Sequence, residues 1–329
     1  MSNRRQILSM GLGALVAPGA FAQQPGKVWR IGFLSARPAP ASINADPLYK
    51  AFLDGMRDLG YSAGKNLVVT WRFGDGSYGR LVELAADLAA TKVDVIVTHA
   101  EGTLAAQKAT TTIPIVSAVM IDDPVVTGFA KSLGHPGGNI TGMYPYASEF
   151  VAKYLELLMV AVPKASRIAV IGNPDNASSG QFGIALQDAA KKLKVNVLLL
   201  NARSPQEIEL SYERMAREKV SAAVILPSGF YLQHVRQLAE LAVRHRIPSI
   251  WGGFQYPQAG GLMSYGFYAT ENYRRAATFV DKILKGTKAG DLPIEQPMRY
   301  QFVINRKAAN TLGIAIPHEL LLRADEVIE

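Results

Sequence analysis

Residues 30–34 are Arg-Ile-Gly-Phe-Leu, and residues 167–171 are Arg-Ile-Ala-Val-Ile. Both stretches are short and apolar, which predicts buried β-strands. They stand 137 residues apart, and two further pairs follow in the same order at offsets of 129 and 134 residues. The further pairs are Val95-Ile96-Val97 with Val224-Ile225-Leu226, and Ile113-Pro114 with Ile247-Pro248. We interpret this pattern as one βα unit that occurs twice along the chain.

Similar apolar runs alternate with amphipathic helical patterns over almost the whole chain. One such pattern places Val151, Tyr154, Leu155 and Leu158 on a single helix face. Alternation of helices with buried strands predicts parallel sheets covered on both faces. We therefore expect an α/β protein with two doubly wound parallel-sheet lobes joined by a multi-strand hinge. The predicted strands are Trp29–Leu34, Leu67–Phe73, Val93–Thr98, Ile115–Val119, Arg167–Gly172, Val195–Leu200, Ala222–Leu226 and Ser249–Trp251.

The chain is expected to cross between the lobes more than once. Gly137-Gly138-Asn139-Ile140-Thr141-Gly142 predicts the first crossing, and the stretch 286–297, rich in Gly and Pro, predicts the last. Between them, a strand at Leu262–Tyr265 and a helix at 270–285 are expected to return to the first lobe. Residues 27–142 and 261–286 would then form the first lobe, and residues 143–260 and 287–329 the second.

The N-terminus has the pattern of an export signal. Arg4 and Arg5 precede an apolar run from Met10 to Phe21, and Ala20-Phe21-Ala22 supplies a small-x-small cleavage site. The run is shorter than the about 20 residues of a membrane span. The arginine pair fits either a twin-arginine signal or the charged start of an ordinary signal. We expect residues 1–22 to be a cleaved signal peptide and the mature chain to be a free periplasmic protein.

Composition narrows the classes of function. The 329 residues include no cysteine, which excludes disulfides and acylation at an N-terminal cysteine. The formal net charge is +8, but the basic residues are scattered, as at Lys191-Lys192 and Arg274-Arg275. No basic stripe interleaved with aromatic residues is present. This distribution is typical of a solvated surface, so we expect no nucleic-acid partner.

Ligands of doubly wound sheets bind beyond the carboxyl ends of the strands. Two such edges would face each other across the hinge, and the residues there are polar or aromatic, as in small-molecule sites. We expect an amino-acid-like ligand, with helix N–H groups at Gly102 and Thr103 for its carboxylate and Glu101, Asp122 or Asp123 for its ammonium. The predicted ligand-binding residues are Ser35, His99, Glu101, Gly102, Thr103, Asp123, Tyr146, Asn173, Asn176, Ser228, Phe230 and Trp251.

These residues also have plainer interpretations. Ser35, Thr103 and Asp123 suit helix caps or turns, His99 suits local capping, and Trp251 suits core packing.

The chain contains no G-x-x-x-x-G-K-[ST] phosphate loop and no G-x-S-x-G nucleophile elbow. Its five histidines are far apart and show no metal-ligand spacing. We therefore expect a binding protein with no metal and no cofactor, and not an enzyme.

Several stretches, taken in order, extend this interpretation. They include Arg30–Ser35, Phe52–Tyr61, Thr112–Val116, Pro136–Gly142, Gly260–Gly266, Asp291–Pro297 and Phe302–Asn305. In these stretches the chain resembles the TrpX/YtrX-type substrate-binding proteins of ABC transporters, over nearly the whole mature length. The resemblance implies a type I periplasmic-binding-protein fold and capture of a small molecule between the lobes. It also implies delivery to a membrane permease with a separate ATPase. Some relatives bind aromatic amino acids.

Two other functions fit the same features. A periplasmic sensor that signals through a membrane partner would share the fold and the pocket. An exported α/β enzyme would need a nucleophile with a base in hydrogen-bond reach. We expect the transport receptor, acting as a monomer.

Overall fold

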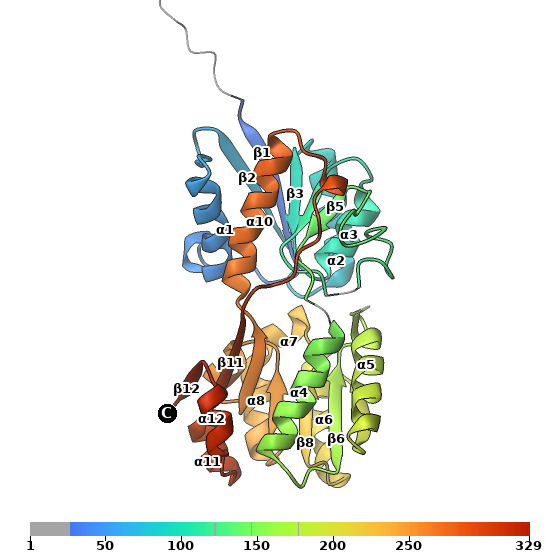
Figure 1. The fold of residues 1–329 in the computed structure, drawn as a ribbon, viewed down its shortest axis with the longest axis vertical. Helices are drawn as coiled ribbons and strands as arrows, with labels where there is room; N and C mark the ends of the chain where they lie inside the picture. The colour runs from blue at the N-terminus through green and yellow to red at the C-terminus, as the bar shows by residue number, and fades with distance from the viewer. Residues whose placement is uncertain (1–26, 122, 146, 177) are drawn as a thin grey trace, which may run out of the picture.

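The structure is a computed structural model that describes residues 27–121, 123–145, 147–176 and 178–329. Two lobes lie one above the other, each built around its own sheet (Figure 1). The prediction of an α/β protein with two lobes is therefore confirmed. The predicted signal peptide, residues 1–22, lies outside the described residues.

The first lobe contains a five-stranded parallel sheet in the order β2-β1-β3-β4-β5. Alternate residues of β1 enter two cores: Ile31 and Phe33 pack with α1 and α10, and Leu34 packs with α2 and α3. Helices thus cover both faces, as the continuous apolar strands predict. The elements are β1 (Trp29–Ser35), η1 (Ile43–Ala45), α1 (Pro47–Asp58), β2 (Leu67–Phe73), α2 (Tyr78–Ala90), β3 (Val95–Thr98), α3 (Gly102–Ala109), β4 (Ile115–Ser117), β5 (Ile140–Gly142), α10 (Ala269–Leu284) and η2 (Ala289–Asp291).

The second lobe contains a seven-stranded sheet in the order β12-β11-β10-β9-β8-β6-β7. Ile168 and Val170 of β6 face α4 and α5, whereas Ala169 and Ile171 face α6 and α8. Strands β10 and β11 are antiparallel, and the other pairs are parallel. The elements are α4 (Ala147–Ala161), β6 (Arg167–Gly172), α5 (Ser178–Lys192), β7 (Asn196–Asn201), α6 (Pro205–Arg217), β8 (Ala222–Ile225), α7 (Gly229–Gln233), α8 (Val235–Arg244), β9 (Ser249–Trp251), α9 (Gln255–Gln258), β10 (Met263–Phe267), β11 (Tyr300–Asn305), α11 (Arg306–Leu312), α12 (His318–Arg323) and β12 (Glu326–Ile328).

Strand pairing corrects one expectation. The strand predicted at Leu262–Tyr265 does not return to the first lobe, because β10 pairs with β9 and β11 in the second sheet. The glycines before it serve a turn after α9, in which Gly260 has a φ of 103° and the Gly261 N–H donates to the Tyr256 carbonyl. The chain crosses only after β10, since α10 packs on α1 of the first lobe (Figure 1).

The chain passes between the lobes three times: between β5 and α4, between β10 and α10, and between η2 and β11. Glu295 links the first of these segments to the last. Its N–H donates to the Gly142 carbonyl at 2.9 Å, and its own carbonyl accepts from the Tyr144 N–H at 2.8 Å. Arg275 of α10 makes two hydrogen bonds to the Glu295 carboxylate, at 2.7 and 2.6 Å. The segments that pass between the lobes are thus tied together on the side of the first lobe.

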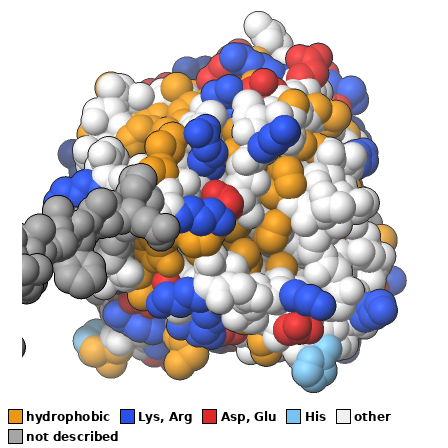
Figure 2. All heavy atoms as spheres, turned by 90° about the horizontal axis from the view of Figure 1, so that it is seen from above, with side chains coloured by type: hydrophobic (Ala, Val, Ile, Leu, Met, Phe, Trp, Pro, Cys, Tyr) orange, Lys and Arg blue, Asp and Glu red, His pale blue; other side chains and the backbone are white. Residues whose placement is uncertain are grey.

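The face of the first lobe that points away from the second is mixed in character (Figure 2). Lys and Arg side chains are dispersed there among apolar and neutral atoms and form no continuous stripe. In the molecule as a whole, several arginines pair with carboxylates, as Arg72 of β2 does with Asp87 and as Arg299, next to Tyr268, does with Glu271. Within the described residues, no helix has both the length and the apolar character that a membrane span requires.

Candidate functional site

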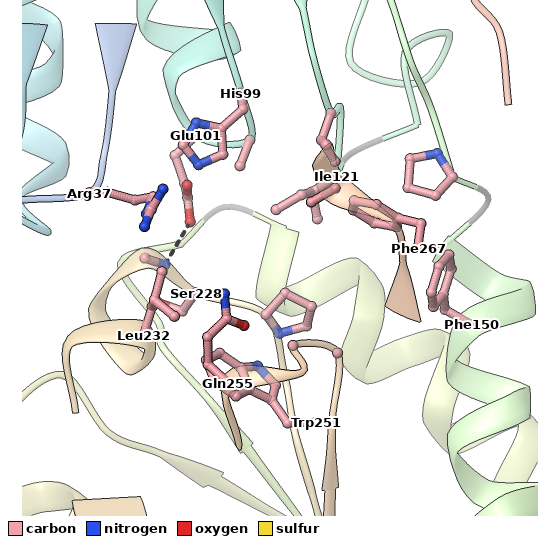
Figure 3. A pocket seen from close by; sticks show the side chains of 18 of the residues that line it. Arg37, His99, Glu101, Ile121, Phe150, Ser228, Leu232, Trp251, Gln255 and Phe267 are labelled. Carbon is pink, nitrogen blue, oxygen red and sulfur yellow. Dashed lines mark hydrogen bonds between the residues drawn. The ribbon is translucent and has the colours of Figure 1, made fainter. Parts of the chain in front are cut away.

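A cavity of about 190 Å³ lies between the lobes, at the carboxyl ends of strands from both sheets (Figure 3). The first lobe contributes residues that follow β1, β3 and β4, and the second contributes residues that follow β8 and β9. Apolar side chains form most of the wall, with a few polar groups, which is the usual composition of a small-ligand site. The aromatic lining residues are Phe150, Tyr154, Phe182, Trp251, Phe267 and Tyr273.

Arg37 brings a guanidinium group to this cavity, two residues beyond the end of β1. Its Nη2 pairs with an Asp46 carboxylate oxygen at 2.7 Å, and its side chain is 18% exposed. Its Nε and Nη1 are buried and have no hydrogen-bond partner among the described residues. Unpaired buried N–H groups cost free energy, and a guanidinium matches a carboxylate in geometry. Arg37 is therefore suited to bind an anionic group.

His99 lies on the same side of the cavity as Arg37 (Figure 3). Burial, and to a smaller degree the charge of Arg37, lowers the pKa of His99 to about 3. The imidazole is therefore neutral at physiological pH and carries one donor and one acceptor nitrogen. Its Nδ1 is buried without a partner in the described part of the chain. His99 can thus hydrogen-bond a ligand without adding a charge to the site.

Glu101 connects the two lobes beside the cavity. Its Oε1 accepts hydrogen bonds from the Tyr78 hydroxyl at 3.1 Å, Asn176 Nδ2 at 3.3 Å and the Gly229 N–H at 3.4 Å. The Tyr78 hydroxyl also lies 3.2 Å from Ser228 Oγ. Burial and the Glu101 charge raise the pKa of Tyr78 far above its usual value, so its phenol stays protonated. We call these five residues the interlobe network, because its hydrogen bonds join the two lobes across the cleft.

The cavity brings together four of the predicted ligand-binding residues: His99, Glu101, Ser228 and Trp251. Asn176 does not line it but contacts Glu101 through the interlobe network. Tyr146 and Asp122 lie outside the described residues. The structure thus places the predicted segments at the ends of β3, β8 and β9 at one cavity, and the contacts of each residue with a ligand stay a prediction.

Three other predicted residues serve local structure and do not line the cavity. Ser35 Oγ lies 2.8 Å from the Tyr49 hydroxyl, and Asp123 Oδ1 accepts from the N–H groups of Val125 and Val126. Phe230 packs against His234 in the second lobe, with ring centroids 4.5 Å apart and the ring planes tilted by 53°. Ser35 thus joins β1 to α1, Asp123 shapes its own turn, and Phe230 packs against the next helix.

The start of α3 also differs in chemistry from what we expected. The helix begins at Gly102, as predicted, but its first N–H groups are not free for a carboxylate. The Gly102 N–H donates to the His99 carbonyl at 3.1 Å, and the Thr103 N–H donates to the Ala100 carbonyl at 3.0 Å. The Thr103 hydroxyl lies 2.8 Å from Ser117 Oγ. The Gly102 and Thr103 N–H groups are therefore already bonded within the turn that precedes the helix.

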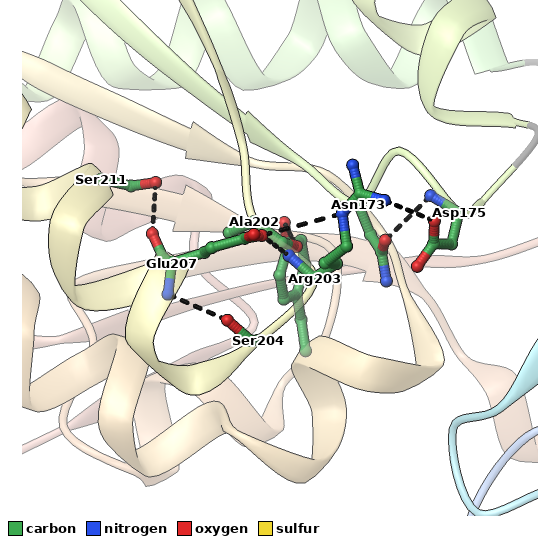
Figure 4. Close-up of polar contacts among 8 residues, drawn as sticks. Asn173, Asp175, Ala202, Arg203, Ser204, Glu207 and Ser211 are labelled. Carbon is green, nitrogen blue, oxygen red and sulfur yellow. Dashed lines mark hydrogen bonds and ion pairs between the residues drawn. The ribbon is translucent and has the colours of Figure 1, made fainter.

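Asn173 belongs to a polar cluster at the β7 edge of the second sheet (Figure 4). Its Oδ1 accepts from the Asp175 N–H at 3.0 Å, and the Asp175 carboxylate pairs with Arg203 at 3.5 Å. Ser204 Oγ accepts a hydrogen bond from the Glu207 N–H, and the Glu207 carboxylate accepts one from the Arg203 N–H. These two hydrogen bonds cap the N-terminus of α6. Asn173 therefore shapes the loop after β6 and does not line the cavity.

Sequence reasoning misses Arg37 and most of the aromatic wall. Phe150 and Tyr154 come from α4, Phe182 comes from α5 and Phe267 comes from β10. Helical periodicity marks Tyr154 as buried but does not say whether a core or a cavity covers it. The position of Arg37 just after a predicted strand was a signal that could have identified it.

Comparison with known proteins assigns this architecture to a family. The family described as ABC transporter substrate binding protein matches residues 42–328. This chain belongs to the ABC transporter substrate-binding protein family. The resemblance found in the sequence is thereby confirmed, and the family is one of ligand-binding transport proteins, not of enzymes. No group of three or more His, Asp or Glu side chains in the described residues could hold a metal ion.

Three known proteins are similar to this chain. A tyrosine-binding protein of Clostridioides difficile is 26% identical over 272 residues, which are 82% of this chain and 77% of that protein. A crystal structure of a conserved domain protein from Vibrio cholerae is 27% identical with a TM-score of 0.84, covering 92% of this chain and 100% of that one. An ABC domain from Streptococcus pneumoniae in complex with L-Trp shares the fold, at 24% identity and a TM-score of 0.82 with the same coverage.

Proposed function

We propose that this substrate-binding protein is exported, captures an aromatic amino acid in the interlobe cavity and delivers it to the permease and ATPase of an ABC importer. One observation carries the proposal. A single cavity between the lobes combines an aromatic wall with the buried Arg37 guanidinium, whose Nε and Nη1 have no partner among the described residues. The tyrosine-binding relative and the relative in complex with L-Trp support the choice of ligand class.

The two sides of the cavity differ in a way that suits such a ligand. Arg37, His99 and Glu101 lie toward one side, and Phe150 and Phe267 lie toward the other (Figure 3). The ligand carboxylate would bind the Arg37 guanidinium, and its ring would pack against the aromatic side chains. An aromatic amino acid places a carboxylate and a ring at opposite ends of one small molecule, which matches this division.

Closure follows from the position of the cavity. A ligand that touches Arg37 of the first lobe and Trp251 of the second makes both sets of contacts only when the lobes are together. Such a ligand shifts the population toward the closed state by its differential affinity for that state. This proposal includes two lobes that move relative to each other, with boundaries near residues 142, 268 and 295. It also includes an export signal at residues 1–22.

Thermal unfolding of the chain from Gln23 onward, with each standard amino acid in turn, tests the proposal. A bound ligand at 100 times its Kd stabilises by about 2.7 kcal/mol, so an increase in Tm is expected with one or more of the aromatic amino acids. If aromatic amino acids produce no shift at millimolar concentration, the proposed ligand class is wrong.

The Arg37→Lys variant tests the anchor. Lysine keeps the positive charge but loses the bidentate fork, so the Kd is expected to rise at least about tenfold. The Tm of the ligand-free variant should stay close to that of wild type, because a charge next to Asp46 is retained. Arg72→Lys is the matched control, since Arg72 pairs with Asp87 outside the cavity. Equal affinity in Arg37→Lys and wild type would remove Arg37 from the site.

A further inference from the structure

The Tyr154 hydroxyl in the cavity wall has no hydrogen-bond partner among the described residues. Tyr154 of α4 is 1% exposed and lines the cavity. A β-carbon at Gly252 would lie 2.6 Å from the Tyr154 hydroxyl oxygen, so this oxygen is next to a lining glycine. No hydrogen bond of this hydroxyl is found among the residues that the structure describes. Burial raises the pKa of Tyr154 well above its usual value, so the group stays a neutral phenol that can donate or accept.

The hydroxyl lies in the apolar part of the cavity. The Tyr154 ring is 6.2 Å from the Phe150 ring, and the Phe150 ring is 5.8 Å from that of Phe267, measured between centroids. Phe150 and Phe267 are on the side of the cavity opposite Arg37 (Figure 3). A ligand anchored at Arg37 by its carboxylate would direct its side chain toward Tyr154.

We propose that Tyr154 determines specificity by forming a hydrogen bond with a polar atom on the ligand's ring. The site then prefers a phenol or an indole side chain to an unsubstituted benzyl side chain. This inference rests on the proposed function, because it takes the ligand to be an aromatic amino acid. A buried hydroxyl left unpaired costs free energy, and a site built to bond a polar atom discriminates against the analogue that lacks it. The absence of a side chain at Gly252 leaves space beside the hydroxyl for that ring atom.

Isothermal titration calorimetry with L-tyrosine, L-tryptophan and L-phenylalanine tests this inference. Wild type is expected to bind tyrosine or tryptophan about tenfold more tightly than phenylalanine. In Tyr154→Phe the preference should fall to about one, with phenylalanine bound as tightly as before or more tightly. The amino acid that loses affinity in the variant, tyrosine or tryptophan, identifies which ring atom meets the hydroxyl.

Tyr231→Phe is the matched control. Tyr231 is also fully buried in the second lobe, but its hydroxyl donates to the Ala202 carbonyl at 2.9 Å and it does not line the cavity. This variant should unfold at a lower temperature and keep the wild-type order of affinities. Equal binding of all three amino acids by wild type, or an unchanged preference in Tyr154→Phe, overturns the role of Tyr154 and leaves the proposed function intact. Failure of wild type to bind any of the three overturns both.

Discussion

Two basic side chains face the cavity in different protonation states. Arg37 is charged and pairs with Asp46 at 2.7 Å, while burial keeps His99 neutral. A guanidinium is hard to deprotonate, so a buried guanidinium stays charged and is stabilised by a carboxylate partner. An imidazole instead responds to burial by losing its proton. The polar side of the cavity therefore offers one cation and one neutral hydrogen-bonding ring.

The depressed pKa of His99 predicts a pH-dependent stability. His99 titrates at about 3 in the folded protein against 6.5 as its ordinary value, so the unfolded chain binds the extra proton between these pH values. The stability that neutral His99 contributes is present above pH 6.5 and is lost as the pH falls toward 3. Between pH 7 and pH 5 the wild type should lose at most about 2 kcal/mol that His99→Gln does not lose. Urea unfolding at both pH values measures the difference, and identical losses in the two proteins would contradict it.

At the scale of elements, the end of β5 requires a glycine. Gly142 has a φ of 141°, and a β-carbon there would lie 2.0 Å from the Ser117 carbonyl oxygen on the paired strand β4. Because a backbone atom would have to move, Gly142→Ala is expected to lower the free energy of unfolding by about 3 kcal/mol. Chemical denaturation measures this loss directly.

Gly79→Ala provides the comparison. Gly79 is exposed in α2, and a β-carbon there would meet nothing within 4 Å. Replacing a helical glycine with alanine should stabilise the protein by up to about 1 kcal/mol. Opposite signs for the two variants support the close approach at Gly142, and a comparable loss in both would argue against it.

Local pattern predicts some elements better than others. The run at Arg167–Gly172 is apolar and buried after its first residue, and it forms β6 with the predicted bounds. Strands β5, β11 and β12 were not predicted, whereas β4 and β9, which like β5 and β12 have three residues each, were. The sheet to which β10 belongs depends on pairing with β11, which follows it by more than 30 residues, so local pattern carries no information on it.

For the whole molecule, the interlobe network predicts an effect on affinity from outside the cavity. The Tyr78 hydroxyl bridges Glu101 and Ser228 but Tyr78 does not line the cavity. Tyr78→Phe removes contacts made only in the closed state, so the open state should gain population and the Kd should rise about fivefold. Small-angle X-ray scattering of the ligand-free protein should show a larger radius of gyration in the variant.

Tyr61→Phe separates closure from stability. The Tyr61 hydroxyl donates to Asp281 at 2.9 Å within the first lobe, and burial with this carboxylate raises the pKa of Tyr61 to about 12. This variant should lower the Tm and leave both the Kd and the radius of gyration unchanged. If Tyr78→Phe behaves in the same way, the interlobe network does not control closure.

By itself the sequence determined the class of fold, the two related lobes and the segments that meet at the strand ends. These follow from local hydrophobic periods, which depend on residues close together in the chain, and from the recurrence of the Arg30–Leu34 pattern at Arg167–Ile171. Only the tertiary structure decided that β10 joins the second sheet and that Arg37 reaches the cavity. It also decided that the Tyr154 hydroxyl lies in the cavity wall with no hydrogen-bond partner in the part of the chain that the structure describes. The physical reason is that burial patterns specify which face of an element avoids water. Whether a core, a neighbouring strand or a ligand covers that face is decided by segments distant in sequence.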